Sequence, residues 1–224
     1  MSSIVDFKTE KDFRNFLISK KLSYIAEGSE GKCYASLVDN DAYKVLFDKD
    51  KYFEVDYEVE EIITTEDIDL KSFAFPKEIY TINGQIKAYK TKKIDKDFFQ
   101  FEEDFNLYSI NFLKLEKAYL NIKKDVISLS KAGIEIYDLC FNLIFDGENL
   151  VGIDTCGYKK VDYDVLEKNI ASLDYAIINV LTVCLSYENI IFYKDCNEVD
   201  QYIRNVGQLV KKEKQKIKRK KFAC

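Results

Sequence analysis

The sequence predicts an α+β protein in which a strand-rich part is followed by a helix-rich part. Between residues 22 and 90, short runs of alternating apolar residues are separated by turn residues, as in an antiparallel sheet. Between residues 104 and 217, apolar residues recur at steps of three and four, as they do on helices. The chain has 224 residues and is 47% hydrophobic, enough for a sizeable core. We therefore expect two lobes, residues 1–90 and 91–224.

The first lobe is expected to contain five antiparallel strands and two helices. A leading helix is predicted at 8–19, behind Thr9 and Glu10. Three strands follow, at 22–27, 32–38 and 42–47, separated by GSEG and VDND. Residues 50–66 carry apolar side chains at helical spacing among acids, which predicts a helix lying on the sheet. Asn83-Gly84 favours a type I′ turn and so predicts a hairpin that supplies the last two strands.

The second lobe is expected to be mainly helical. Its helices are predicted at 104–131, 164–187 and 197–217, the second apolar on most faces. A hairpin is expected between the first two helices, within Ala132–Tyr158. A basic tail follows at 211–221.

Composition excludes several kinds of site. The chain has no histidine, so it cannot form a Ser-His or Cys-His triad, and acid-base chemistry would fall on Asp, Glu, Lys or Tyr. Its six cysteines are far apart without a CxxC pair, which favours reduced, mostly buried thiols over metal ligands. No apolar run is long enough to span a bilayer, and the N-terminus lacks the apolar core of a signal peptide. We therefore expect a cytoplasmic protein with no membrane span.

The charge is unevenly distributed along the chain. Residues 211–221 hold eight basic residues and one acid, a local charge of +7, which leaves −12 for the rest of a chain whose net charge is −5. Such a tail could contact an acidic partner, such as nucleic acid, anionic lipid or the acidic body itself, or it could be a solvated helix end.

Two features of the first lobe could bind a phosphate group. Gly28 and Gly31 lie in a turn between two strands, where backbone N–H groups can approach an anion, although a plain hairpin would use the same residues. Lys44 lies in an otherwise apolar strand and points either into a cleft or to solvent at a sheet edge. If it points inward, its partner is expected on the acidic helix, as Glu58 or else Glu61.

In the second lobe, Asp138, Asn142 and Asp154 flank one hairpin. Two carboxylates and an amide placed in this way can hold a metal-bound phosphate, although aspartates are also common turn residues. Phosphoryl transfer needs positioning and charge neutralisation more than covalent help, and no histidine is required.

This ordered set resembles the protein kinase-like superfamily over residues 22–185. The resemblance implies a two-lobed fold, with ATP and Mg²⁺ as cofactors. It implies that Gly28, Ser29 and Gly31 form the loop over the nucleotide and that Ile86 to Thr91, including Ala88, form the hinge that borders adenine. It implies catalytic roles for Lys44, which would hold the α and β phosphates, Glu58, which would pair with Lys44, and Asp138, which would accept the proton of the substrate hydroxyl. Asn142 and Asp154 would then bind the metal.

Some residues depart from the family pattern. Glu30 adds negative charge to the glycine-rich turn, Asn142 follows Asp138 by four residues where the family usually has five, and Asp154 begins Asp-Thr-Cys-Gly. Only about a dozen residues separate Asp154 from the next helix, so the resemblance is to the compact bacterial-style branch, which includes aminoglycoside and choline phosphotransferases and minimal protein kinases.

Two main functions follow as expectations. The first is an ATP/Mg²⁺-dependent phosphotransferase that acts on a hydroxyl of a protein or small molecule. The alternative is a catalytically inactive pseudokinase that binds a nucleotide or a protein. A third possibility is a nucleic-acid or membrane partner that acts through residues 211–221.

Overall fold

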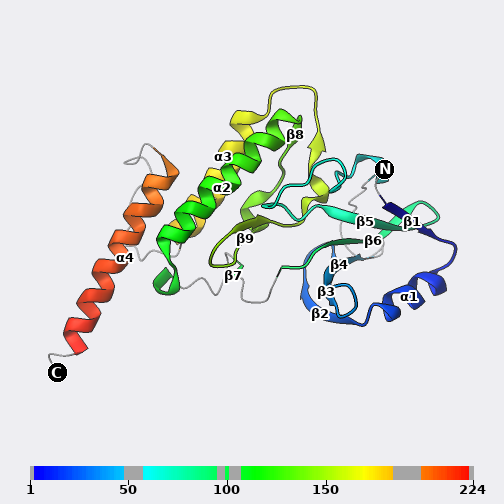
Figure 1. Cartoon of the computed structure of the whole chain (residues 1–224), viewed down its shortest axis with the longest axis horizontal. Helices are drawn as coiled ribbons and strands as arrows, with labels where there is room; N and C mark the ends of the chain where they lie inside the picture. Colours follow the sequence, from blue (N-terminus) through cyan, green and yellow to red (C-terminus); the bar gives the residue numbers. More distant parts are fainter. Residues whose placement is uncertain (1–2, 48–57, 95–98, 101–106, 184–197, 222–224) are drawn as a thin grey trace. The chain divides into compact units, whose positions relative to one another are not determined.

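The computed structural model describes residues 3–47, 58–94, 99–100, 107–183 and 198–221, which form two compact units (Figure 1). The sheet unit comprises residues 1–95 with 154–160, and the helical unit comprises 96–153 with 161–224. The class is α+β, as predicted. No helix in the described part of the chain is both long enough and apolar enough to cross a membrane.

A six-stranded mixed sheet forms the sheet unit. Its strands are β1 (Ser3–Phe7), β2 (Leu22–Glu27), β3 (Gly31–Ser36), β4 (Asp41–Leu46), β5 (Pro76–Ile82) and β6 (Gln85–Lys92), in the order β1-β5-β6-β4-β3-β2. The five predicted strands, β2 to β6, are confirmed and pair antiparallel. The sixth strand, β1, was not predicted, and it pairs in parallel with β5. The partner of a parallel strand lies far along the chain, so no turn residues next to β1 indicate this pairing.

Helix α1 (Glu10–Ser19) confirms the predicted leading helix. The Thr9 hydroxyl caps its N-terminus by accepting a hydrogen bond from the Asp12 N–H. The helix connects β1 and β2, which form opposite edges of the sheet, and Figure 1 shows it beside the strands. Its Phe13 is buried against Tyr43, Tyr80 and neighbouring residues of the central strands. These residues form the core on the first face of the sheet, the face that α1 covers.

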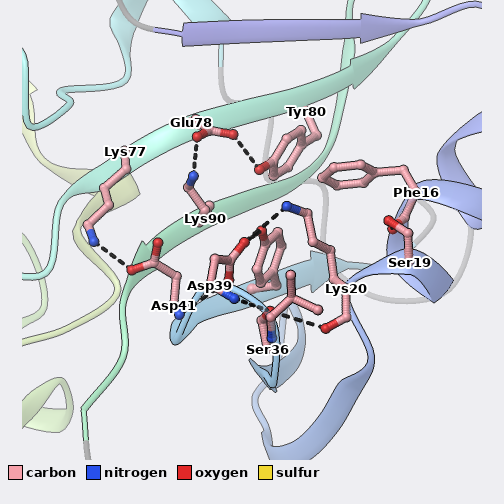
Figure 2. Close-up of polar contacts among 12 residues, drawn as sticks. Phe16, Ser19, Lys20, Ser36, Asp39, Asp41, Lys77, Glu78, Tyr80 and Lys90 are labelled. Carbon is pink, nitrogen blue, oxygen red and sulfur yellow. Dashed lines mark hydrogen bonds and ion pairs between the residues drawn. The ribbon is translucent and has the colours of Figure 1, made fainter.

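A network of charged residues and tyrosines also joins α1 to the sheet (Figure 2). Lys20, at the end of α1, donates to Asp39 at 3.0 Å, and the Tyr43 hydroxyl donates to the same carboxylate oxygen at 2.6 Å. The Tyr43 and Tyr80 rings are stacked with centroids 5.9 Å apart, and Tyr80 donates to Glu78 at 2.7 Å. Because these polar ends are paired with one another, the network stabilises the unit without a ligand.

The structure of the segment between β4 and β5 differs from the prediction. A helix was expected over 50–66, but residues 48–57 lie outside the described part of the chain. The described remainder makes one 3₁₀ turn, η1 (Val59–Glu61), followed by irregular chain in which Ile62 and Ile63 are buried. The spaced apolar residues therefore reach the core without forming a helix over this stretch.

Three helices and small hairpins make up the helical unit. The helices are α2 (Phe112–Lys131), α3 (Leu166–Val183) and α4 (Val199–Lys221), and short 3₁₀ turns lie at η2 (Leu107–Ser109) and η3 (Leu139–Phe141). The strands are β7 (Phe99–Gln100), β8 (Ile134–Glu135), β9 (Leu143–Phe145) and β10 (Leu150–Gly152). The three predicted helices are confirmed over the residues that the structure describes, although α2 begins at Phe112 and not near 104, because Asn111 caps it there. Residues 104–106, 184–187 and 197 of the predicted spans lie outside the described part of the chain.

The helices of this unit pack around a common core. Helix α2 buries one stripe of apolar residues, and Figure 1 shows α2 and α3 side by side. Hydrogen bonds connect the three helices: Tyr119 of α2 donates to Asp174 of α3 at 2.7 Å, and Thr182 of α3 lies 2.9 Å from the Tyr202 hydroxyl of α4. Arg204 of α4 donates to Glu116 of α2 at 2.5 Å. The predicted hairpin is β9-β10, whose strands pair antiparallel.

The short segment after β10 belongs to the sheet unit. It contains η4 (Thr155–Gly157) and β11 (Lys159–Lys160). Thr155 donates to the Ala74 carbonyl at 3.4 Å, and the buried Tyr158 ring packs edge-on against Phe75 with centroids 5.9 Å apart. Asp154, the first residue of this segment, is thereby fixed to the sheet.

Candidate functional site

The centre of the candidate site is Lys44, which is buried on the second face of the sheet. Only 6% of Lys44 is exposed. Across the strands its neighbours are Cys33 on β3 and Tyr89 on β6, and Ile79 on β5 lies beyond Tyr89. A lysine at such a position is stable only if its charge is paired. Of the two alternatives that the sequence left open, the inward-pointing lysine is confirmed.

Two carboxylates pair with the Lys44 ammonium. Its Nζ lies 2.5 Å from Asp154 Oδ1 and 2.7 Å from Glu30 Oε2. Burial opposes the charged form, but the carboxylates of Asp154 and Glu30 outweigh it and hold the pKa of Lys44 above its ordinary value. The Asp154 partner is 110 residues away along the chain, so this contact depends on the tertiary fold.

Tyr89 and Cys156 complete the surroundings of this pair. The Tyr89 hydroxyl donates to Asp154 Oδ1 at 2.9 Å, and the Lys44 ammonium lies 5.9 Å from the centre of the Tyr89 ring. Burial raises the pKa of Tyr89 well above its ordinary value and that of Cys156 to about 12, so both stay protonated. Neither group is therefore suited to act as a base near pH 7.

Asp154 has a left-handed backbone, with φ 56° and ψ 48°. Aspartate tolerates this conformation better than most residues, and such outliers often occur at functional sites. Because Oδ1 accepts the bonds from Lys44 and Tyr89, Oδ2 is the oxygen that a cation would take. The side chain is 28% exposed, so the carboxylate is accessible.

The glycine-rich turn places Glu30 at Lys44. The Gly28 N–H donates to the Gly31 carbonyl at 2.9 Å, and the Phe47 N–H donates to the Glu30 carbonyl at 2.9 Å. A Cβ on Gly31 would come within 2.3 Å of the Val45 carbonyl oxygen, whereas one on Gly28 would meet nothing within 4 Å. Gly31 is thus required by the packing of β3 on β4. Gly28 and Ser29 are exposed.

Two residues assigned from the resemblance lie apart from Lys44. Glu58 is exposed just before η1, and the ion-pair partners that the structure gives Lys44 are Glu30 and Asp154. Ala88 is fully buried in the core beneath α1, on the opposite face of the sheet from Lys44. The expected hinge at 86–91 is regular strand within β6, where side chains alternate between faces.

The helical unit contains the other predicted residues, Asp138 and Asn142. Asp138 is exposed, with a left-handed backbone at φ 51° and ψ 42°, immediately before η3. The Asn142 side-chain amide donates to the Asp138 carbonyl at 2.9 Å, and the Asn142 carbonyl accepts from the Ile153 N–H at 2.7 Å. The tight 3₁₀ turn thus connects the two residues over a spacing of four.

A buried asparagine that the sequence analysis missed supports this loop. Asn169 of α3 is fully buried, and its amide nitrogen donates to the Ile134 carbonyl at 2.8 Å and to the Ser130 hydroxyl at 2.9 Å. Its oxygen accepts from the Ile136 N–H at 2.9 Å. These bonds hold the chain just before Asp138. A polar residue within the apolar stretch of α3 was the available signal.

The donor set fits a cation that arrives together with a ligand. Within the described residues, no three Cys, Asp or Glu side chains gather closely enough to hold a metal ion by themselves. Mg²⁺, however, commonly takes one or two protein oxygens and completes its shell with phosphate oxygens and water. In the sheet unit, Asp154 Oδ2 is an atom of the right chemistry.

A scan against protein-family models found no match to this sequence. A search among curated proteins found no similar sequence either.

Proposed function

We propose that this protein is a small ATP- and Mg²⁺-dependent phosphotransferase that transfers the γ-phosphate to a hydroxyl group of a protein or small molecule. The observation that carries the proposal is the buried pair of Lys44 and Asp154, 2.5 Å apart and 110 residues apart in sequence. A buried ion pair contributes little to stability compared with apolar residues of similar size, so its presence favours a functional role.

Each residue has a proposed role that its chemistry suits. Lys44 would bind phosphate oxygens as a positive charge, and Asp154 would bind Mg²⁺. The resemblance implies a second metal-ligand role for Asn142. Bound ATP supplies the phosphoryl group, and bound Mg²⁺ neutralises its charge. Asp138, on its left-handed backbone before η3, would accept the proton of the acceptor hydroxyl. Asn142 donates its amide nitrogen to the Asp138 backbone carbonyl, and its side-chain oxygen has the chemistry of a metal ligand.

The test is transfer of the γ-phosphate from ATP in the presence of Mg²⁺, with water and the protein itself as acceptors. We expect Asp138→Asn to lower the rate by about 10²- to 10⁴-fold, the usual contribution of a general base. Asp154→Asn is expected to lower the rate and weaken the response to Mg²⁺. Asp162→Asn, which changes an exposed acid of the helical unit, is the matched control and should keep the wild-type rate. Equal turnover by all four proteins would refute the proposal.

One observation favours a second function, a catalytically inactive pseudokinase that binds a nucleotide or a protein. The Glu30 carboxylate already occupies the Lys44 ammonium at 2.7 Å, where phosphate oxygens would bind. Thermal unfolding with ATP and Mg²⁺ distinguishes the two functions when combined with the turnover assay. A ligand at 100 times its dissociation constant stabilises the folded state by about 2.7 kcal/mol. Stabilisation without turnover in the wild type would support the pseudokinase.

A further inference from the structure

The proposed function gives roles to Lys44 and Asp154 but none to Glu30, the second carboxylate that pairs with Lys44. We propose that Glu30 determines ligand specificity, so that the site accepts a phosphate ligand only as its complex with a divalent cation. This inference rests on the proposed function, because it concerns the same phosphate-binding lysine. The Glu30 carboxylate would thus select the metal complex of the nucleotide over the free nucleotide.

The first argument is the balance of charge around Lys44. One ammonium lies between the carboxylates of Asp154 and Glu30, so the three groups together carry more negative than positive charge. Lys44 is 6% exposed, and charges in such surroundings are screened less than they are in water. Phosphate oxygens that approach this lysine therefore meet net repulsion. A divalent cation that arrives with them reverses the balance.

The second argument is that the turn places Glu30 firmly. The Phe47 N–H donates to the Glu30 carbonyl, and the Gly28 N–H donates to the Gly31 carbonyl. Gly31 also fits so closely against Val45 that no other residue has room there. The backbone is thus held on both sides of Glu30, and its carboxylate lies 2.7 Å from the Lys44 ammonium.

The third argument is a contrast with Glu27, the other acid at this turn. Glu27 pairs with Lys32 at 3.3 Å, and both side chains are more than 40% exposed, so water screens their charges. The Glu30 side chain is only 22% exposed and contacts the one buried lysine of the cluster. Glu30 would affect phosphate binding because its carboxylate is partly buried beside Lys44, whereas the exposed Glu27 would not.

The test measures ADP binding by calorimetry, once with excess Mg²⁺ and once with a chelator. For the wild type we expect affinity to fall at least about tenfold when the metal is removed, as expected for uncompensated like charges at a binding site. Glu30→Gln should raise the metal-free affinity and bring the two values close together. Glu30→Asp, which keeps the charge, should retain the metal requirement, and Glu27→Gln, the matched control, should behave as the wild type.

The outcomes separate this inference from the proposed function. If the wild type and Glu30→Gln bind ADP with the same ratio of affinities with and without Mg²⁺, the inference is wrong and nucleotide binding stands. If no variant binds ADP under either condition, both proposals fail. If only Glu30→Gln binds, with or without metal, the carboxylate excludes nucleotide altogether, and the selection of the metal complex is refuted. Circular dichroism confirms that each variant is folded.

Discussion

Lys44 illustrates how one residue can indicate both a structure and a function. Burial alone would disfavour its ammonium, yet the pKa of Lys44 is held above its ordinary value by Asp154 and Glu30. Removal of Lys44 would leave two carboxylates without their shared cation, which is strongly destabilising in a buried site. Variants of this cluster are therefore best made isosteric, such as Asn for Asp and Gln for Glu, so that binding is tested separately from folding.

The two glycines of the turn should respond differently to substitution. A Cβ at position 31 would meet the Val45 carbonyl oxygen at 2.3 Å and the Leu46 Cα at 2.9 Å, and neither backbone atom can move without disturbing β4. We expect Gly31→Ala to lower the free energy of unfolding by about 1–3 kcal/mol. Gly28→Ala, which has open space around it, should stay within about 0.5 kcal/mol of the wild type. Urea denaturation measures both, and equal losses would contradict this account.

Asp39 should make stability depend on pH. Partial burial disfavours its charge, but hydrogen bonds with Tyr43, Ser36 and Lys20 outweigh it and hold the pKa of Asp39 well below its ordinary value. A depressed carboxylate pKa contributes stability above the unfolded pKa of about 4, and this stability is lost as the pH falls toward the folded value.

We expect Asp39→Asn to cost about 1–3 kcal/mol at pH 7, because it weakens charge-assisted hydrogen bonds to Lys20 and Tyr43. The loss should shrink when the pH is lowered below 4. Unfolding free energies measured between pH 7 and 3 would show the two curves converging. A constant difference across this range would mean that the Asp39 charge is not the cause.

At the scale of elements, the packing of α4 against α2 depends on Gly207. A Cβ at this position would lie 2.7 Å from Phe112 Cβ and 2.8 Å from its Cγ, atoms near the backbone that cannot swing aside. In an exposed helix, glycine to alanine stabilises by about 1 kcal/mol, but overpacking here should reverse the sign and cost about 1–3 kcal/mol. Gln208→Ala, on the exposed neighbour, is the control. A rise in melting temperature for Gly207→Ala would contradict this close contact.

The end of α4 differs in character from its beginning. Its last buried residue among those described is Val210, and Lys211, Lys212 and Lys216 are exposed. The helix nevertheless continues through the basic segment to Lys221, where positive charge favours a helix C-terminus. The basic tail is therefore helical. That it contacts an acidic partner stays a prediction.

For the whole molecule, local signals predicted most of the fold. Strands β2 to β6 follow from alternation and turn residues, and Asn83-Gly84 adopts the two positive φ angles that its type I′ turn requires. Strand β1 was missed because its partner, β5, lies beyond five other elements in the chain. The helix expected at 50–66 was inferred from apolar spacing alone. In the described part of this segment the chain is mostly irregular, and the apolar residues Ile62 and Ile63 are buried.

The candidate site was predictable where a residue type was unusual for its element. Lys44 was predicted as a site residue because a lysine is unusual in an apolar strand. Asp154 was predicted from its place at the hairpin. Glu30 was noticed as an added negative charge, but its role as a Lys44 partner depends on side-chain directions at a turn, which sequence does not specify. Ala88 was expected in a hinge that borders adenine, and its side chain is buried in the core cluster with Phe13, Tyr43 and Tyr80.

The parallel pairing of β1 also affects how the chain folds. Its residues pair with partners 75 positions later, Ser3 with Glu78 through Phe7 with Ile82, so on the ribosome this strand must wait until β5 has been made. After β5 has formed and until β1 docks, the edge of β5 has unpaired backbone groups that could accept a strand from another molecule. Strand β1 thus acts as an intramolecular cover, and how quickly it docks decides whether a newly made chain closes its own sheet or joins a neighbour's.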